Sequence, residues 1–170
     1  MQAELSSSNL QIIFCPDPMQ EIWTNRPPMP ESPAFVYDIE YAGKSCTEKI
    51  ASIRTELKKK GAESVMLSAL DEIAWTLNLR GNDVHCNPVV ISYLLITEDS
   101  TILFIAPEKV TEEVRNYLKE QKVEIRNYAE TEIYLSDLKS TSILMNPAKT
   151  NYAIFSSVNP KCRIIRGEAP

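Results

Sequence analysis

The chain has 170 residues, of which 44% are hydrophobic, and carries a formal net charge of −5. That length suits one ordinary domain, or one domain with part of another, and the apolar content is sufficient for a packed core. The acidic balance argues against a nucleic-acid partner, because such proteins need a basic surface against the phosphate backbone. No apolar run approaches the roughly 20 residues of a transmembrane helix, so we expect no membrane partner.

The four cysteines form neither a CxxC pair nor a closely spaced framework, so we interpret them as free thiols (Cys15, Cys46, Cys86 and Cys162). Free thiols are typical of a reducing compartment. Residues 1–14 lack the basic start of a signal peptide. These features predict a cytoplasmic protein.

The amino-terminal part of the chain contains a short apolar run and then a cluster of prolines. Leu10–Cys15 predicts a strand. Four prolines between residues 27 and 33 predict a stiff, extended connector, because proline fixes φ and removes a backbone donor. We place a domain boundary here, with residues 1–33 as the tail of a preceding domain plus a linker and residues 34–170 as the main domain.

The main domain begins with a helix and a strand. A capping box formed by Ser45 and Glu48 opens a helix to about Lys60, where Gly61 ends it. Residues 63–68 then predict a strand.

The stretch 68–89 contains a second predicted helix and a polar loop. We expect Ser68 to cap this helix and Gly81 to end it, with apolar residues recurring along one face. Trp75 lies within it and is expected in the core or at an interdomain contact. Arg80 is expected near the free carbonyl groups at the helix end.

The second half of the chain continues with alternating strands and helices. Residues 89–97 and 101–106 are two apolar runs joined by a short polar turn, which indicates a hairpin. Further helices are predicted over 111–121, 130–138 and 150–156, and further strands over 123–127, 142–145 and 162–165. This order predicts an α/β fold, a three-layer α/β/α sandwich with a mixed β-sheet.

The loop after the second helix is the one polar cluster that exceeds the needs of a simple turn. It contains Arg80, Asn82, Asp83, His85 and Asn87. One interpretation is a solvated loop with internal Asx-type hydrogen bonds. The other is a surface that faces another domain or subunit, bordering an active-site cleft.

Several kinds of catalytic and cofactor site have no support in the sequence. His85 is the only histidine, and there is no HExxH or HxxxH pattern, so we predict no metal site in this chain. No glycine-rich phosphate loop is present. Asp71 and Glu72 fit the first turn of a helix better than a catalytic pair. We therefore assign no catalytic and no cofactor-binding residue.

The stretch that begins at Ser68, with the second predicted helix and the polar loop, resembles a known family. SALDEIAWTLNLRG followed by NPVVISYLL closely resembles the LDEIAWLLNLRG…NPVFFSY signature of aminopeptidase P, the Xaa-Pro aminopeptidases. The segment IWTNRPPMP also resembles the interdomain segment of the three-domain form. The resemblance lies in the non-catalytic, creatinase/prolidase-type amino-terminal region, whose fold is ribonuclease-H-like.

The resemblance implies a function for a longer parent protein. That parent would be a metallopeptidase that releases the amino-terminal residue before proline, with two divalent metal ions, usually manganese, activating water. Its five metal ligands lie in a carboxy-terminal domain, and none can be matched here. This chain would be the second domain, shaping access to the active site and subunit packing in a homodimer. The alternatives are a catalytically inactive protein-binding module, or a prolidase- or creatinase-type parent.

Overall fold

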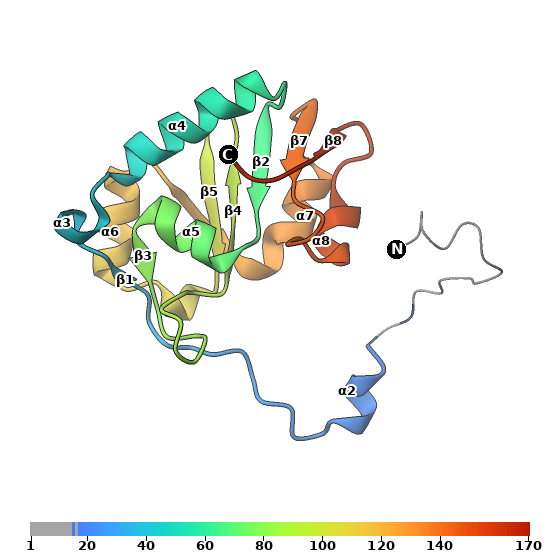
Figure 1. The fold of residues 1–170 in the computed structure, drawn as a ribbon. Helices are drawn as coiled ribbons and strands as arrows, with labels where there is room; N and C mark the ends of the chain where they lie inside the picture. Colours follow the sequence, from blue (N-terminus) through green and yellow to red (C-terminus); the bar gives the residue numbers. More distant parts are fainter. Residues whose placement is uncertain (1–14, 16) are drawn as a thin grey trace.

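The computed structural model describes residue 15 and residues 17–170, so most of the predicted strand Leu10–Cys15 lies outside the described residues. Six strands form one sheet in the order β6-β5-β4-β2-β7-β8 (Figure 1). Their bounds are β2 (Ser64–Leu67), β4 (Ser92–Ile96), β5 (Thr101–Ile105), β6 (Glu124–Asn127), β7 (Ser142–Met145) and β8 (Arg163–Arg166). Every strand of this sheet was predicted from the sequence.

The sheet is mixed because β4 runs against both of its neighbours. It pairs antiparallel with β2 and β5, whereas β5–β6, β2–β7 and β7–β8 are parallel pairs. Leu94 lies opposite Leu67 on one side and Leu103 on the other. All residues of β2, β4, β5 and β7 are buried, as expected for near-continuous apolar strands covered on both faces.

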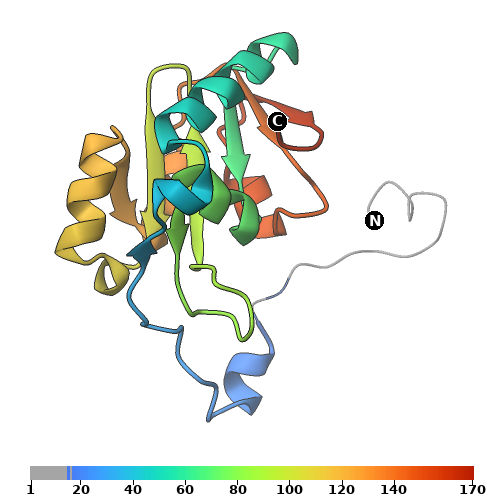
Figure 2. The same cartoon turned by 60° about the vertical axis from the view of Figure 1, so that its left-hand side comes forward.

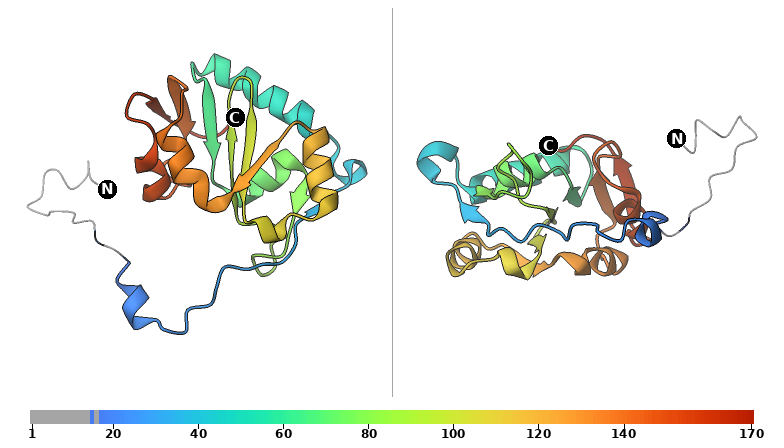
Figure 3. Two further views of the ribbon diagram at one scale, coloured as in Figure 1. Left: turned by 180° about the vertical axis from the view of Figure 1, so that it is seen from behind. Right: turned by 90° about the horizontal axis from the view of Figure 1, so that it is seen from below.

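Helices cover both faces of the sheet, which confirms the three-layer architecture. One core cluster joins the sheet to α4 (Cys46–Lys59), α5 (Leu70–Leu77) and α6 (Glu112–Glu120). A second cluster joins the sheet to α7 (Thr131–Ser136) and α8 (Tyr152–Ser157). Figure 1 shows α4 and α5 in front of the sheet, and the view from behind in Figure 3 brings α7 forward.

The structure also contains short elements outside the six-stranded sheet and the helices that cover it. β1 (Phe35–Val36) and β3 (Leu79–Arg80) form a separate two-stranded antiparallel sheet. α3 (Ile39–Ala42) follows β1, and the 3-10 turns η1 (Pro107–Lys109) and η2 (Tyr128–Glu130) follow β5 and β6. Before the main domain, α2 (Met19–Ile22) precedes residues 26–34, which form neither helix nor strand. No helix among the described residues is long and apolar enough to span a membrane.

The central helix α5 begins and ends differently from the prediction. Its N-cap is Ala69, without a side-chain hydrogen bond, and the Ser68 hydroxyl instead lies 3.3 Å from that of Thr150. The helix ends at Leu77, because Asn78 takes the left-handed conformation with φ 52°. Asparagine tolerates that conformation better than most residues. The predicted N-cap and the predicted stop at Gly81 were therefore wrong.

Candidate functional site

The polar loop runs from residue 82 to residue 91, between β3 and β4. In Figures 1 and 2 it extends beyond the end of the sheet, on the same side as the connector that precedes β1. Its two ends are close together because Gly81 packs against Val90. A Cβ at position 81 would lie 2.3 Å from Cγ2 of Val90, so the role of Gly81 is close packing rather than helix termination.

Asp83 anchors the base of this loop inside the protein. Its Oδ2 accepts a hydrogen bond from the Ile91 amide at 2.7 Å and forms an ion pair with the Lys109 ammonium. Both side chains of the pair are 0% exposed. Lys109 belongs to η1, and its carbonyl accepts from the Ala34 amide at 2.9 Å. The pair therefore joins the loop, η1 and the start of β1.

The burial of Asp83 corrects the expectation that all five predicted site residues share one solvated or partner-facing surface. One oxygen, Oδ1, is buried without a hydrogen-bond partner. The sequence signal for this pair is weak, since it consists only of a lysine shortly after a buried apolar strand. Most lysines in such positions lie in solvent.

Arg80 also points away from the loop tip. Its Nη1 donates to the carbonyl oxygens of Ala74 at 2.6 Å and Leu79 at 2.8 Å, and its guanidinium lies 4.5 Å from the ring centroid of Tyr37. Of these two carbonyls only that of Ala74 belongs to α5, and it also accepts from the Asn78 amide, so the predicted contact with free carbonyls at the helix end is not confirmed. Arg80 holds α5 against the β1–β3 sheet.

The remaining predicted residues are exposed, and two of them lie at the loop tip. Val84 and Asn87 form an isolated β-bridge, with the Asn87 amide donating to the Val84 carbonyl at 3.1 Å. Cys86 turns the tip with φ 61°. The side chains of His85 and Asn87 are exposed there, and Asn82 is exposed near the base. A buried ion pair thus supports a short, exposed tip with hydrogen-bonding side chains.

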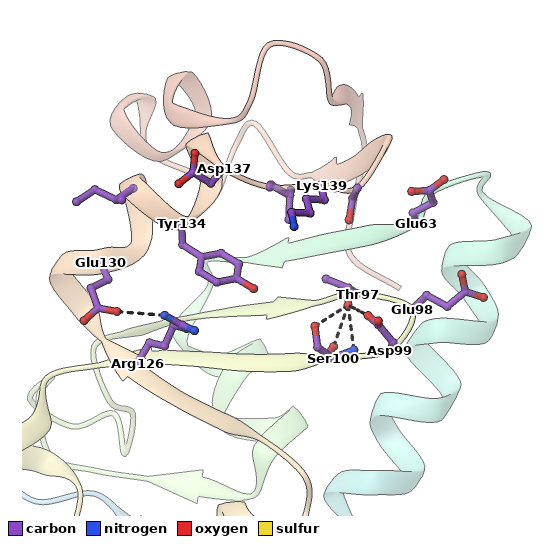
Figure 4. Close-up of a pocket in the computed structure, with 13 residues that line it drawn as sticks. Glu63, Thr97, Glu98, Asp99, Ser100, Arg126, Glu130, Tyr134, Asp137 and Lys139 are labelled. Atoms are coloured by element: carbon purple, nitrogen blue, oxygen red, sulfur yellow. Dashed lines mark hydrogen bonds and ion pairs between the residues drawn. The ribbon is translucent and has the colours of Figure 1, made fainter.

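A second concave region lies at the other end of β4, around the turn between β4 and β5. Figure 4 shows this groove, of about 990 Å³, between the hairpin turn, β6 and α7. The Arg126 guanidinium lies 5.0 Å from the Tyr134 ring centroid and 3.6 Å from the Glu130 carboxylate. Thr97 Oγ1 bonds to Asp99 and Ser100 within the turn. These polar groups serve local structure, and none of the five predicted loop residues lines the groove.

The described residues do not fit a dinuclear metal centre. Within residue 15 and residues 17–170, no three His, Cys, Asp or Glu side chains lie close enough together to hold an ion. Cys46 and Cys162 are buried, and burial raises the pKa of the Cys46 thiol to about 12. A thiol with that pKa is a poor nucleophile or metal ligand at neutral pH.

Trp75 does not belong to the core of this chain. Its side chain is 50% exposed, which rules out the predicted core position and leaves the interdomain contact as the remaining prediction. The Lys49 ammonium lies 4.5 Å from the ring centroid. Lys49 also donates to the carbonyl of Trp75 at 2.7 Å and to Oδ1 of Asn78 at 2.5 Å.

Comparisons with known proteins cover nearly the whole chain. A probable Xaa-Pro aminopeptidase P of Sordaria macrospora is 44% identical over 133 residues, covering 75% of this chain and 22% of that protein. Aminopeptidase P2 of Arabidopsis thaliana is 37% identical over 147 residues, covering 85% of this chain and 21% of that protein. The chain thus spans about a fifth of the length of these curated relatives.

A solved structure agrees with these relatives. The X-prolyl aminopeptidase of Caenorhabditis elegans, described as a cytosolic enzyme with a di-nuclear active site, superposes with a TM-score of 0.88. It is 29% identical, and the match covers 96% of this chain and 28% of that one. The model of the creatinase/prolidase N-terminal domain matches residues 25–170. The chain therefore belongs to the creatinase/prolidase N-terminal domain family.

Proposed function

We propose that this chain is a non-catalytic domain of an Xaa-Pro aminopeptidase, a metallopeptidase that releases the amino-terminal residue before proline. The relatives that carry that name support the proposal, as does the fold shared with the C. elegans enzyme. Residues 1–33 would be the end of a preceding domain plus a linker, and residues 34–170 the second domain. The two metal ions, manganese in kind, would bind to residues outside this chain.

The role of this domain would be to shape access to the active site and to help pack the subunits of a homodimer. The observation that carries this role is the loop, whose base is fixed by a buried ion pair while its tip exposes hydrogen-bonding side chains. A rigid base lowers the entropic cost of holding the tip against another domain or a peptide. His85 and Asn87 are the side chains that would border the cleft. A cytosolic location, as in the C. elegans enzyme, is part of the proposal.

The first test is hydrolysis of an Xaa-Pro peptide with added manganese. This chain and the native gene product read past Pro170 are compared at equal concentration. Activity only in the longer protein supports the proposal. Activity in this chain alone contradicts it, and inactivity of both proteins favours the alternative, a peptidase-like binding module.

The loop role has its own test in the longer protein. The double variant His85→Ala/Asn87→Ala is compared with Asn116→Ala, which removes an exposed amide from α6. We expect a several-fold rise in KM or fall in kcat for the loop variant only. Both melting temperatures should stay near that of the parent, since such surface substitutions change stability by only about 0.5 kcal/mol. Unchanged kinetics in the loop variant would show that the tip does not border the cleft.

A further inference from the structure

The carboxyl end of the described chain lies in a groove beside Trp75. After β8, the Glu168 carbonyl accepts a hydrogen bond from Nζ of Lys60 at 2.9 Å, and Ala169 packs against the core cluster on that face. Ala169 and Pro170 then line a groove of about 230 Å³ together with Trp75. Figure 1 shows this last segment crossing in front of β2 and ending between α4 and α5.

The groove has an apolar wall and an acidic rim. Ile53 and Leu67 contribute apolar surface beside the Trp75 ring, while Asp71 and Glu72 lie at the rim. The Glu72 carboxylate is paired with Lys149 at 2.5 Å. Asp71 is exposed, and its charge remains at the edge of the groove.

Trp75 lies on the solvent side of α5, one turn after the exposed Asp71. Its immediate helix neighbours Ala74 and Thr76 are buried, yet half of the indole surface is open to solvent. The Lys49 ammonium lies 4.5 Å from the ring centroid, so one face of the ring already has a cation–π contact within the protein. Large aromatic side chains left half-exposed in an apolar groove are typical anchors of a protein contact.

We propose that the Trp75 groove is the docking surface for the catalytic portion of the same polypeptide, the part that follows Pro170 in a full-length aminopeptidase. The inference rests on the proposed function. A polypeptide that continues from Pro170 leaves directly from this groove, which gives the adjoining residues a high effective concentration there. The match covers only about a fifth of each of these relatives, so they contain enough further polypeptide to cover the groove.

The residues of the groove indicate which side chains of the catalytic portion would bind in it. An apolar side chain would pack on the open part of the Trp75 indole, where desolvation gives the largest gain. A lysine or arginine of the docking segment would face the Asp71 carboxylate at the rim. A second copy of this chain is a different occupant, and it would show itself by a dependence on protein concentration.

Hydroxyl-radical footprinting of the full-length gene product tests the proposal without any substitution. The oxidation rate of Trp75 is measured in the native protein and in urea. We expect at least about tenfold protection, because side chains at the centre of an interface are desolvated. Protection of about twofold, which a half-exposed ring gives by itself, would overturn the proposal. Protection that disappears on dilution would overturn it in favour of a second copy.

A variant pair gives an independent readout. In the full-length protein, Trp75→Ser is compared with Ile133→Ser, which removes a 68% exposed apolar side chain from α7 on the opposite face. We expect faster limited proteolysis just after Pro170 in Trp75→Ser only, and equal rates in both variants would count against docking. Hydrolysis of the Xaa-Pro peptide by the unmodified protein is measured in parallel. An active enzyme with an unprotected Trp75 would refute the docking surface while leaving the proposed function intact.

Discussion

The buried pair between Asp83 and Lys109 makes a strong prediction about stability. Both side chains are 0% exposed, and Asp83 has only one further hydrogen bond, from the Ile91 amide. Lys109→Met preserves most of the apolar stem but leaves the Asp83 carboxylate buried without a counter-charge. Removing one partner of a buried pair costs about 3–5 kcal/mol. For a chain of this size that loss lowers Tm by roughly 6–20 °C.

The measurement is urea unfolding of the wild type, Lys109→Met, Asp83→Asn and the double variant. The double variant should lose less than the sum of the two single variants, because neither charge is then left uncompensated. Lys119→Met, at an exposed position on α6, is the matched control and should change stability by less than about 0.5 kcal/mol. If Lys109→Met costs less than about 1 kcal/mol, the pair is not held in a dry interior and the account of the loop base fails.

Three further predictions concern other parts of the molecule. Gly81→Ala should destabilise the protein by about 1–3 kcal/mol in urea unfolding, because the new Cβ would lie 2.3 Å from Cγ2 of Val90. The double variant Gly81→Ala/Val90→Ala should recover part of that loss. Without recovery, the close approach is not the cause. Hydrogen bonds from the Ser45 hydroxyl and amide lower the pKa of Glu48 in the folded state, so its contribution to stability is present above about pH 4.5 and is lost as the pH falls further. In thermal unfolding between pH 3 and pH 7, Glu48→Gln should therefore lose less stability on acidification than the wild type, and identical pH profiles would contradict the capping-box assignment. A thiol reagent should modify the exposed Cys15 and Cys86 of the native protein quickly, and the buried Cys46 and Cys162 only on unfolding. Fast modification of all four thiols in the native protein would contradict the packing.

The fold could be predicted from the sequence because its signals are local. Continuous apolar runs marked the strands β4 and β5, and the spacing of Ser45 and Glu48 marked the start of α4, where both capping-box hydrogen bonds are present. Alternation of helices and strands then predicted a mixed sheet covered on both faces. The short β1–β3 sheet escaped prediction, because two-residue strands have no periodicity to detect.

The family membership could also be recognised from sequence, since it depends on a contiguous string around α5. The boundaries of that helix could not, because Asn78 ended it through a conformation stabilised by tertiary contacts. Its Oδ1 accepts from the buried Lys49 and its Nδ2 donates to the Lys44 carbonyl at 3.0 Å. Residues distant in sequence supplied both contacts.

Only the tertiary structure distinguished the members of the polar loop. In the sequence, Asp83 and His85 are equivalent polar residues two positions apart. In the fold, Asp83 is enclosed with Lys109, which lies 26 positions further along the chain, while His85 faces solvent. The sequence likewise does not distinguish Trp75 from the other apolar residues of α5. In the fold, Trp75 lies in a groove that it forms with α4 and the last residues of the chain. Local pattern determines which segments form helices and strands, but burial of a particular side chain depends on which distant segment packs over it.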